Sequence, residues 1–190
     1  MELTKSNRQR IIVLTILFSS TLCAYFTSDI INSMQLQALG GSGSKLIKTY
    51  FIYSSVFFAG IPVLFFAFMH ITSRIMLVEI CDEKLSNIDL AYWLSLSMLP
   101  MLSNLCINLY NILEYKSRTP VATKESLMAY HYIFDLDYEE VVNLGLLSTC
   151  LCYLVYIICL CVLGNVTIWK SSLASLLPSG IVLLFFYIAL

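Results

Sequence analysis

Residues 142–163 read VNLGLLSTCLCYLVYIICLCVL, a run of 22 positions without a charged side chain. A helix rises about 1.5 Å per residue, so this run is long enough to cross the roughly 30 Å hydrocarbon core of a bilayer. Further apolar stretches lie at residues 11–31, 50–71, 90–113 and 173–190. The sequence therefore predicts an all-α, polytopic integral membrane helix bundle, a single membrane domain over residues 1–190 with about five transmembrane helices.

The overall composition also indicates a membrane protein. Hydrophobic residues make up 59% of the chain and charged residues 12%, whereas soluble domains contain about 45–50% and about 25%. The net charge of −1 disfavours a nucleic-acid partner, because binding nucleic acid requires a basic surface. The composition therefore predicts lipid and other membrane proteins as the partners.

The N-terminal segment sets the expected orientation. Lys5, Arg8 and Arg10 precede the first apolar stretch, which is longer than the 7–15 apolar residues of a cleavable signal peptide and favours a retained helix. The positive-inside rule then places the N-terminus in the cytoplasm. With five crossings, the C-terminus and the connection at 114–141 lie outside.

The connections carry their own signals. Residues 40–44, GGSGS, predict a flexible turn. Residues 30–39 are expected to prolong the first helix, and residues 73–80 to prolong the second helix beyond the hydrocarbon. Ser86, followed three positions later by Asp89, matches a capping box at the start of the third apolar stretch.

Three apolar stretches contain a proline, at Pro62, Pro100 and Pro178. Proline lacks the backbone N–H and clashes with the preceding turn, so each position predicts a kink or a break. Proton relays and voltage sensors place charge inside the membrane, but no ionisable side chain lies deep within any of the five stretches. The sequence therefore argues against autonomous pumping.

The third apolar stretch carries a polar face. Asn104, Asn108 and Asn111 recur at spacings of four and three residues, so they share one side of a helix. An amide in hydrocarbon needs a hydrogen-bond partner. The face therefore predicts either helix packing through interhelical hydrogen bonds or a polar pathway for a ligand.

A second group of candidates lies in the connections. Contacts with partner proteins are expected from Arg74, Glu79, Tyr130, His131, Asp135 and Asp137. The histidine and its neighbouring acids could bind a metal or a basic partner. Alternatively, they belong to an interfacial aromatic segment whose acids are solvated.

The cysteines do not match a metal site. Cys150, Cys152, Cys159 and Cys161 lie within one apolar stretch as two C-x-C pairs, whereas zinc sites prefer C-x₂₋₄-C on accessible loops. A buried or lipid-facing packing role is expected, since free cysteine behaves as a small apolar residue. Catalytic and nucleotide-binding motifs are also missing from the sequence, so we expect no enzyme activity, metal or cofactor.

Two segments resemble a known family. Residues 90–100, LAYWLSLSMLP, look like a family helix in which a proline follows small and apolar residues. Residues 161–164, CVLG, and 169–178, WKSSLASLLP, look like a glycine-ended helix, a short basic turn and a last helix. Over about 60–180 the chain is similar to the Yip-type membrane domain, named for proteins that interact with Ypt/Rab GTPases. The resemblance implies five helices and a short, bacterial-like member.

These observations predict a non-enzymatic accessory or scaffold subunit of a bacterial cytoplasmic (inner) membrane. It would associate with other membrane proteins, such as the subunits of an export or ABC-type transport complex. Two alternatives stay open, a transporter or permease subunit that uses the asparagine face and an immunity protein against a membrane-active peptide. A homo-oligomer is also open.

Overall fold

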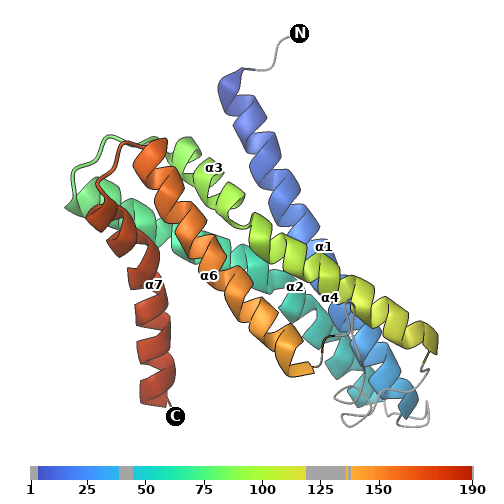
Figure 1. The fold of residues 1–190 in the computed structure, drawn as a ribbon. Coiled ribbons are helices and arrows are strands. Elements are labelled where there is room, and N and C mark those ends of the chain that lie inside the picture. The colour runs from blue at the N-terminus through green and yellow to red at the C-terminus, as the bar shows by residue number, and fades with distance from the viewer. Residues whose placement is uncertain (1–3, 39–44, 119–135, 137, 190) are drawn as a thin grey trace. The chain divides into compact units, whose positions relative to one another are not determined.

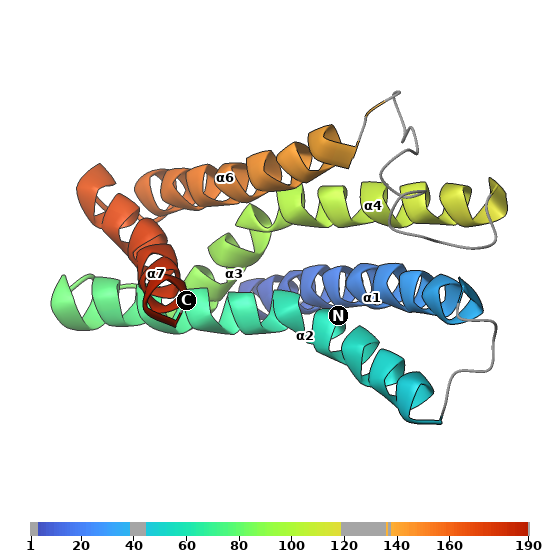
Figure 2. The same cartoon turned by 90° about the horizontal axis from the view of Figure 1, so that it is seen from below.

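The computed structural model describes residues 4–38, 45–118, 136 and 138–189, and every regular element among them is a helix. This confirms the predicted all-α class. The elements are shown in Figures 1 and 2: α1 (Lys5–Ala38), α2 (Lys45–Arg74), the π-helical η1 (Ile75–Ile80), α3 (Asn87–Ser97), α4 (Leu99–Arg118), α6 (Tyr138–Val162) and α7 (Ile168–Ala189).

Several helices are suited to a bilayer. Three are long and apolar enough to cross a membrane, namely Lys5–Gln37, Lys45–Ile80 and Glu139–Val162, and α3 with α4 forms a fourth if the pair is one span. The fifth predicted span belongs to α7, and its side chains beyond Gly180 lie outside the described part of the chain. The count of five and the orientation therefore stay predictions.

The first two helices are longer than the hydrocarbon requires. Helix α1 has 34 residues, and the helix formed by α2 and η1 has 36. At about 1.5 Å per residue both exceed a core of roughly 30 Å. The predicted helical extensions are thus confirmed as far as Ala38 and Ile80.

The prolines differ in their effect. Pro62 and Pro178 lie inside the continuous helices α2 and α7. The third apolar stretch is broken at Met98, two residues before Pro100, where the Met98 N–H donates to the Ser95 carbonyl at 3.1 Å. Pro100 has no N–H to donate to the preceding turn, and it lies in the first turn of α4, where a missing N–H costs little. A break was therefore predicted correctly at Pro100 and does not occur at the other two prolines.

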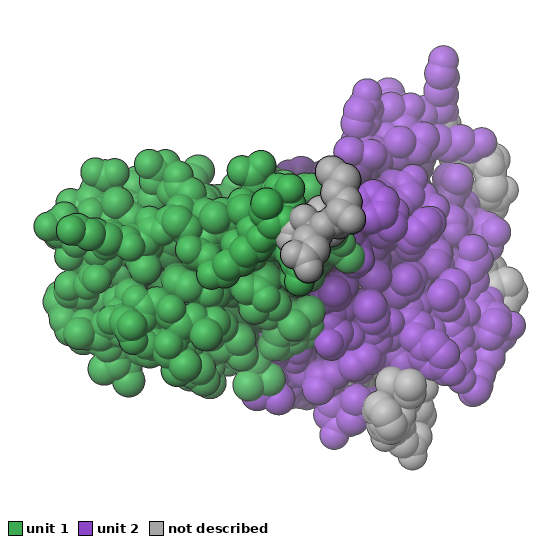
Figure 3. Space-filling view, turned by 90° about the horizontal axis from the view of Figure 1, so that it is seen from above, with its two compact units in different colours: residues 1–17, 63–100, 149–190 green, residues 18–62, 101–148 purple. Residues whose placement is uncertain are grey.

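The described residues belong to two compact units (Figure 3). Unit 1 comprises Met1–Leu17, Val63–Pro100 and Thr149–Leu190, and unit 2 comprises Phe18–Pro62 and Met101–Ser148.

The core of unit 1 is built from apolar side chains of α3, α6 and the end of α2. Tyr156 and Leu160 of α6 are fully buried, as is Leu90 of α3. Trp93 packs into the same cluster with an exposed fraction of 8%. Large side chains therefore hold these three elements together.

Helix α7 packs into unit 1 through small residues. Ser171, Ala174 and Ser175 are fully buried. The Ser73 hydroxyl of α2 donates to the Ala174 carbonyl at 3.1 Å, and the Ser175 hydroxyl donates to the Tyr153 carbonyl of α6 at 3.4 Å. Small polar residues let helix backbones approach closely, as is common in membrane bundles.

Gly164 lies two residues after the end of α6, where a side chain would not fit. A Cβ there would lie 2.7 Å from the Leu160 carbonyl oxygen and 3.1 Å from the Trp93 ring. The next residue, Asn165, has φ 53°, a left-handed conformation that asparagine tolerates better than most residues. The two residues together place the α6–α7 turn against Trp93.

Charged and polar side chains connect the elements at one end of unit 1. Ser86 caps α3 and accepts from the Asp89 N–H at 3.1 Å, which confirms the predicted cap. Gln9 of α1 donates to the Asp89 carboxylate at 2.7 Å, and Lys170 of α7 pairs with Glu83 at 2.6 Å.

Unit 2 is held by an amide and by its own apolar cluster. Asn32 of α1 donates to the Ser55 hydroxyl at 2.8 Å and to the Phe51 carbonyl at 3.1 Å, both on α2. Met34 of α1 and Tyr115 of α4 are almost completely buried against each other. Helix α1 is therefore the element that connects α2 and α4 in this unit.

We expect Gly164→Ala to destabilise the protein, because its Cβ would meet the Leu160 carbonyl and the Trp93 ring. Overpacking of this kind typically costs about 1–3 kcal/mol. Thermal unfolding in detergent should show a lower midpoint. The matched control is Gly180→Ala, where an added Cβ meets nothing within 4 Å. Equal midpoints for the two variants would contradict the described packing.

Candidate functional site

The asparagine face of α4 divides between two environments within unit 2. Asn111 is 2% exposed. The Asn104 side chain lies beside α6, where a Cβ on Gly145 would be 3.6 Å from its Nδ2, and its buried Oδ1 has no hydrogen-bond partner among the described residues. Asn108 instead lines a hollow. The asparagine face therefore contains both a packed residue, Asn111, and a residue that a ligand could reach, Asn108.

The hollow of unit 2 has a volume of about 500 Å³ and lies among α1, α2 and α4. Most of its lining is apolar, with Phe58 and Ile61 from α2 and Leu105 from α4. Its polar side chains come from all three helices: Thr27, Ser28, Asn32, Gln35, Ser54 and Asn108. Such a lining suits an apolar or amphiphilic molecule with a few hydrogen-bonding groups.

Asn32 is a structural residue of this hollow that the sequence analysis did not single out. Its amide already donates to α2 and lies 3.4 Å from the Ser28 hydroxyl. The only available signal was an amide within a helix of apolar character. That signal was hidden because polar and apolar side chains alternate over residues 34–37, so that residues 30–39 were interpreted as an extension of the helix along the membrane interface.

The predicted partner-contact residues are placed only in part. Arg74 ends α2 and Glu79 lies in η1, and both side chains are exposed on unit 1. Tyr130, His131, Asp135 and Asp137 lie outside the described residues. The proposed clustering of the histidine with its acidic neighbours therefore stays a prediction.

The cysteines range from buried to exposed positions. Cys152 is buried and Cys150 is exposed on α6. In unit 2 the sulfur atoms of Cys23 and Cys106 are 3.7 Å apart, between α1 and α4. Over the described ranges, no group of three or more His, Cys, Asp or Glu side chains is arranged to hold a metal ion.

These features describe an all-helical chain with several helices apolar enough to cross a membrane and a partly polar hollow in one unit. Comparisons of the chain with protein-family profiles, with curated proteins and with solved structures find no match. The Yip-type resemblance therefore stays a prediction that rests on the residues quoted above.

Asn32→Leu should destabilise unit 2, because the variant loses two hydrogen bonds between α1 and α2. Interhelical hydrogen bonds in membrane proteins average about 0.6 kcal/mol each, so a loss of roughly 1 kcal/mol is expected. Equilibrium unfolding in mixed micelles measures it. Gln35→Leu is the control, since Gln35 lines the same hollow from an exposed position. If Gln35→Leu destabilised the protein as much as Asn32→Leu, the hydrogen bonds from Asn32 to α2 would not be what stabilises unit 2.

Proposed function

We propose that the protein is a non-enzymatic integral membrane accessory or scaffold subunit that associates with other membrane proteins. The most suitable setting is an export or ABC-type transport complex of a bacterial cytoplasmic membrane. The Yip-type resemblance supports this setting, and the described surfaces support the association.

One observation carries the proposal: an amide is exposed on the outer face of α6 in unit 2. Asn143 lies four residues inside the candidate span Glu139–Val162. Its face also carries Leu146 and Leu147, which are 63% and 56% exposed. The Asn143 side chain has no hydrogen bond with another described residue. Hydrocarbon offers no partner for an amide, whereas a neighbouring transmembrane helix does.

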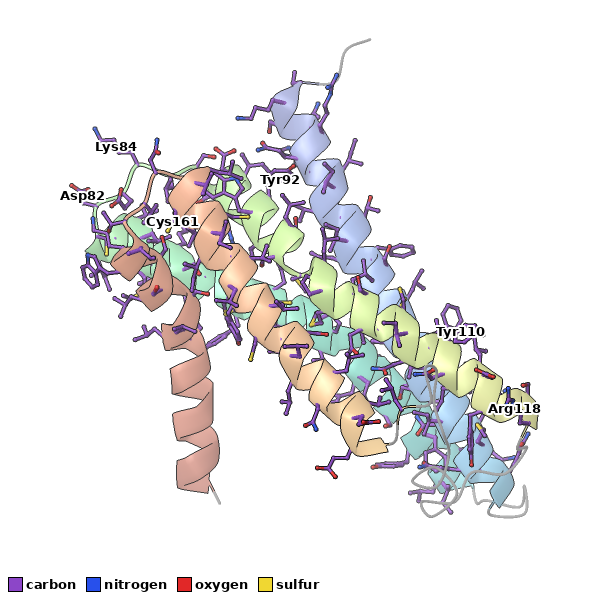
Figure 4. The ribbon with its side chains drawn as sticks, in the orientation of Figure 1. Asp82, Lys84, Tyr92, Tyr110, Arg118 and Cys161 are labelled. Carbon is purple, nitrogen blue, oxygen red and sulfur yellow. The ribbon has the colours of Figure 1, made fainter. Side chains whose placement is uncertain are left out.

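The outer face of α4 offers a similar surface. Ser103 and Tyr110 are seven positions apart, close to two helical turns, and both are exposed, and the Tyr110 ring extends away from the helix (Figure 4). Small side chains beside an aromatic ring allow a second helix to approach closely. Unit 2 thus has two helix faces whose residues suit contacts with another membrane protein.

The hollow of unit 2 favours a second candidate, a transporter or permease subunit. Asn108 and the other polar lining residues would contact the transported molecule. This alternative predicts solute movement by the protein alone, whereas the accessory proposal predicts function only within a complex.

Affinity purification from native membranes in a mild detergent tests the proposal. We expect an integral membrane protein to be recovered in stoichiometric amount, and we expect Asn143→Leu to lower that recovery several-fold. The control is Gln37→Leu, which removes an exposed amide near the end of α1.

Two results would contradict the accessory proposal. One is recovery of the protein alone, and the other is recovery that Asn143→Leu leaves unchanged. Solute flux in liposomes that contain only this protein would instead support the transporter candidate, and Asn108→Phe should then reduce that flux.

A further inference from the structure

The charged residues of unit 1 gather at one end. The start of α1, the connection between η1 and α3, and the turn between α6 and α7 meet there, as the contacts Gln9–Asp89 and Lys170–Glu83 show. Figure 4 labels Asp82, Lys84 and Tyr92 at this end. Each of the three segments borders an apolar helix, so this polar end lies at the level where hydrocarbon meets lipid headgroups.

The polar end contains two adjoining hollows. One has a volume of about 540 Å³ and the other about 460 Å³, and Lys5, Gln9 and Tyr92 line both. Lys84 lines the larger hollow and Arg8 the smaller one. Side chains from α1 and from α3 therefore line both hollows, which share these three residues.

The charge of this lining is positive. Lys5, Arg8 and Lys84 contribute three cations and Asp89 one carboxylate. The Asp89 carboxylate already accepts hydrogen bonds from Gln9 and Ser86. Arg8 and Lys84 are exposed and form no ion pair with any residue that the structure describes. Two cations are thus available to an anion, while Lys170 is paired with Glu83.

The same hollows have an apolar side. Trp93, Leu96 and Leu163 line the larger one, and Ile12 lines the smaller one. A small soluble anion would gain nothing from contact with these apolar side chains. A phospholipid has both a charged headgroup and apolar acyl chains, so it could contact the basic and the apolar residues together. Basic pockets between transmembrane helices are typical sites for anionic headgroups.

We propose that the polar end of unit 1 binds the phosphate group of an anionic membrane phospholipid. Arg8 of the smaller hollow presents a planar fork of donors that matches phosphate oxygens, Lys84 adds charge in the larger hollow, and Lys5 lines both. The acyl region lies along Trp93 and Leu163. This site does not depend on the proposed protein partner, because all of its residues belong to unit 1.

Quenching of Trp93 fluorescence by brominated lipids tests the site. The chain has two tryptophans, so Trp169→Phe leaves Trp93 as the sole emitter in the full-length protein. Brominated phosphatidylglycerol in neutral-detergent micelles should reach half-maximal quenching at a concentration about ten-fold lower than brominated phosphatidylcholine, since each basic residue near a headgroup contributes appreciably.

Variants then assign the preference to the polar end. Lys5→Gln, Arg8→Gln and Lys84→Gln together should remove the difference between the two lipids. The matched control combines Lys45→Gln, Lys48→Gln and Lys116→Gln, which change the net charge equally at exposed positions of unit 2. That control should keep the preference.

Three outcomes would overturn the proposal. The first is equal quenching of Trp93 by both lipids in the Trp169→Phe protein that keeps Lys5, Arg8 and Lys84, a result that needs no charge substitution. The second is a preference that survives the triple variant. The third is relief of quenching by inorganic phosphate at the concentration of the lipid, which would identify a site for soluble phosphate.

Discussion

Polar groups inside hydrocarbon have no water to bond with, and this constraint accounts for most of the described structure. Short hydroxyl side chains satisfy it within their own helix. Thr15, Thr27 and Ser148 each donate to the carbonyl four residues earlier, at 2.8–2.9 Å. These residues therefore leave the helix surface effectively apolar and need no neighbour.

A longer amide can instead reach a neighbouring helix. Asn32 does so by donating to α2, whereas Asn104 lies beside Gly145 of α6 and its buried Oδ1 has no hydrogen-bond partner among the described residues. Asn143 is left on the outer face. The same physical requirement thus explains the packing inside unit 2 and the surface on which the proposed association depends.

The segregation of charge follows from the same constraint. In unit 1 the ionic and strongly polar contacts lie where α1 begins and where two connections turn, and they link segments 80 or more positions apart in the chain. Large apolar side chains such as Tyr156 and Leu160 fill the core of unit 1, away from these polar contacts. The polar end is therefore both a structural junction and a surface where a charged molecule can bind.

The sequence predicted the features that depend on local patterns. Apolar run length predicted the helices, and the spacing of Ser86 and Asp89 predicted a cap that the structure contains. Features that depend on contacts between distant segments were missed. Gln9 gives no local sign that it will meet Asp89, and Gly164 gives none that Trp93 will lie beside it. The division of the asparagine face likewise depends on which helices surround α4.

The central claim is that the helices cross the membrane and bring three segments of unit 1 to the same side: the start of α1, the connection between η1 and α3, and the turn between α6 and α7. Single cysteines at Lys5, Lys84 and Thr167, in a cysteine-free background, can be labelled with an impermeant maleimide in sealed vesicles. All three positions should react from one side, and Lys45→Cys should react from the opposite side because α1 crosses between them. Labelling of Lys5→Cys and Lys84→Cys from opposite sides would contradict the account.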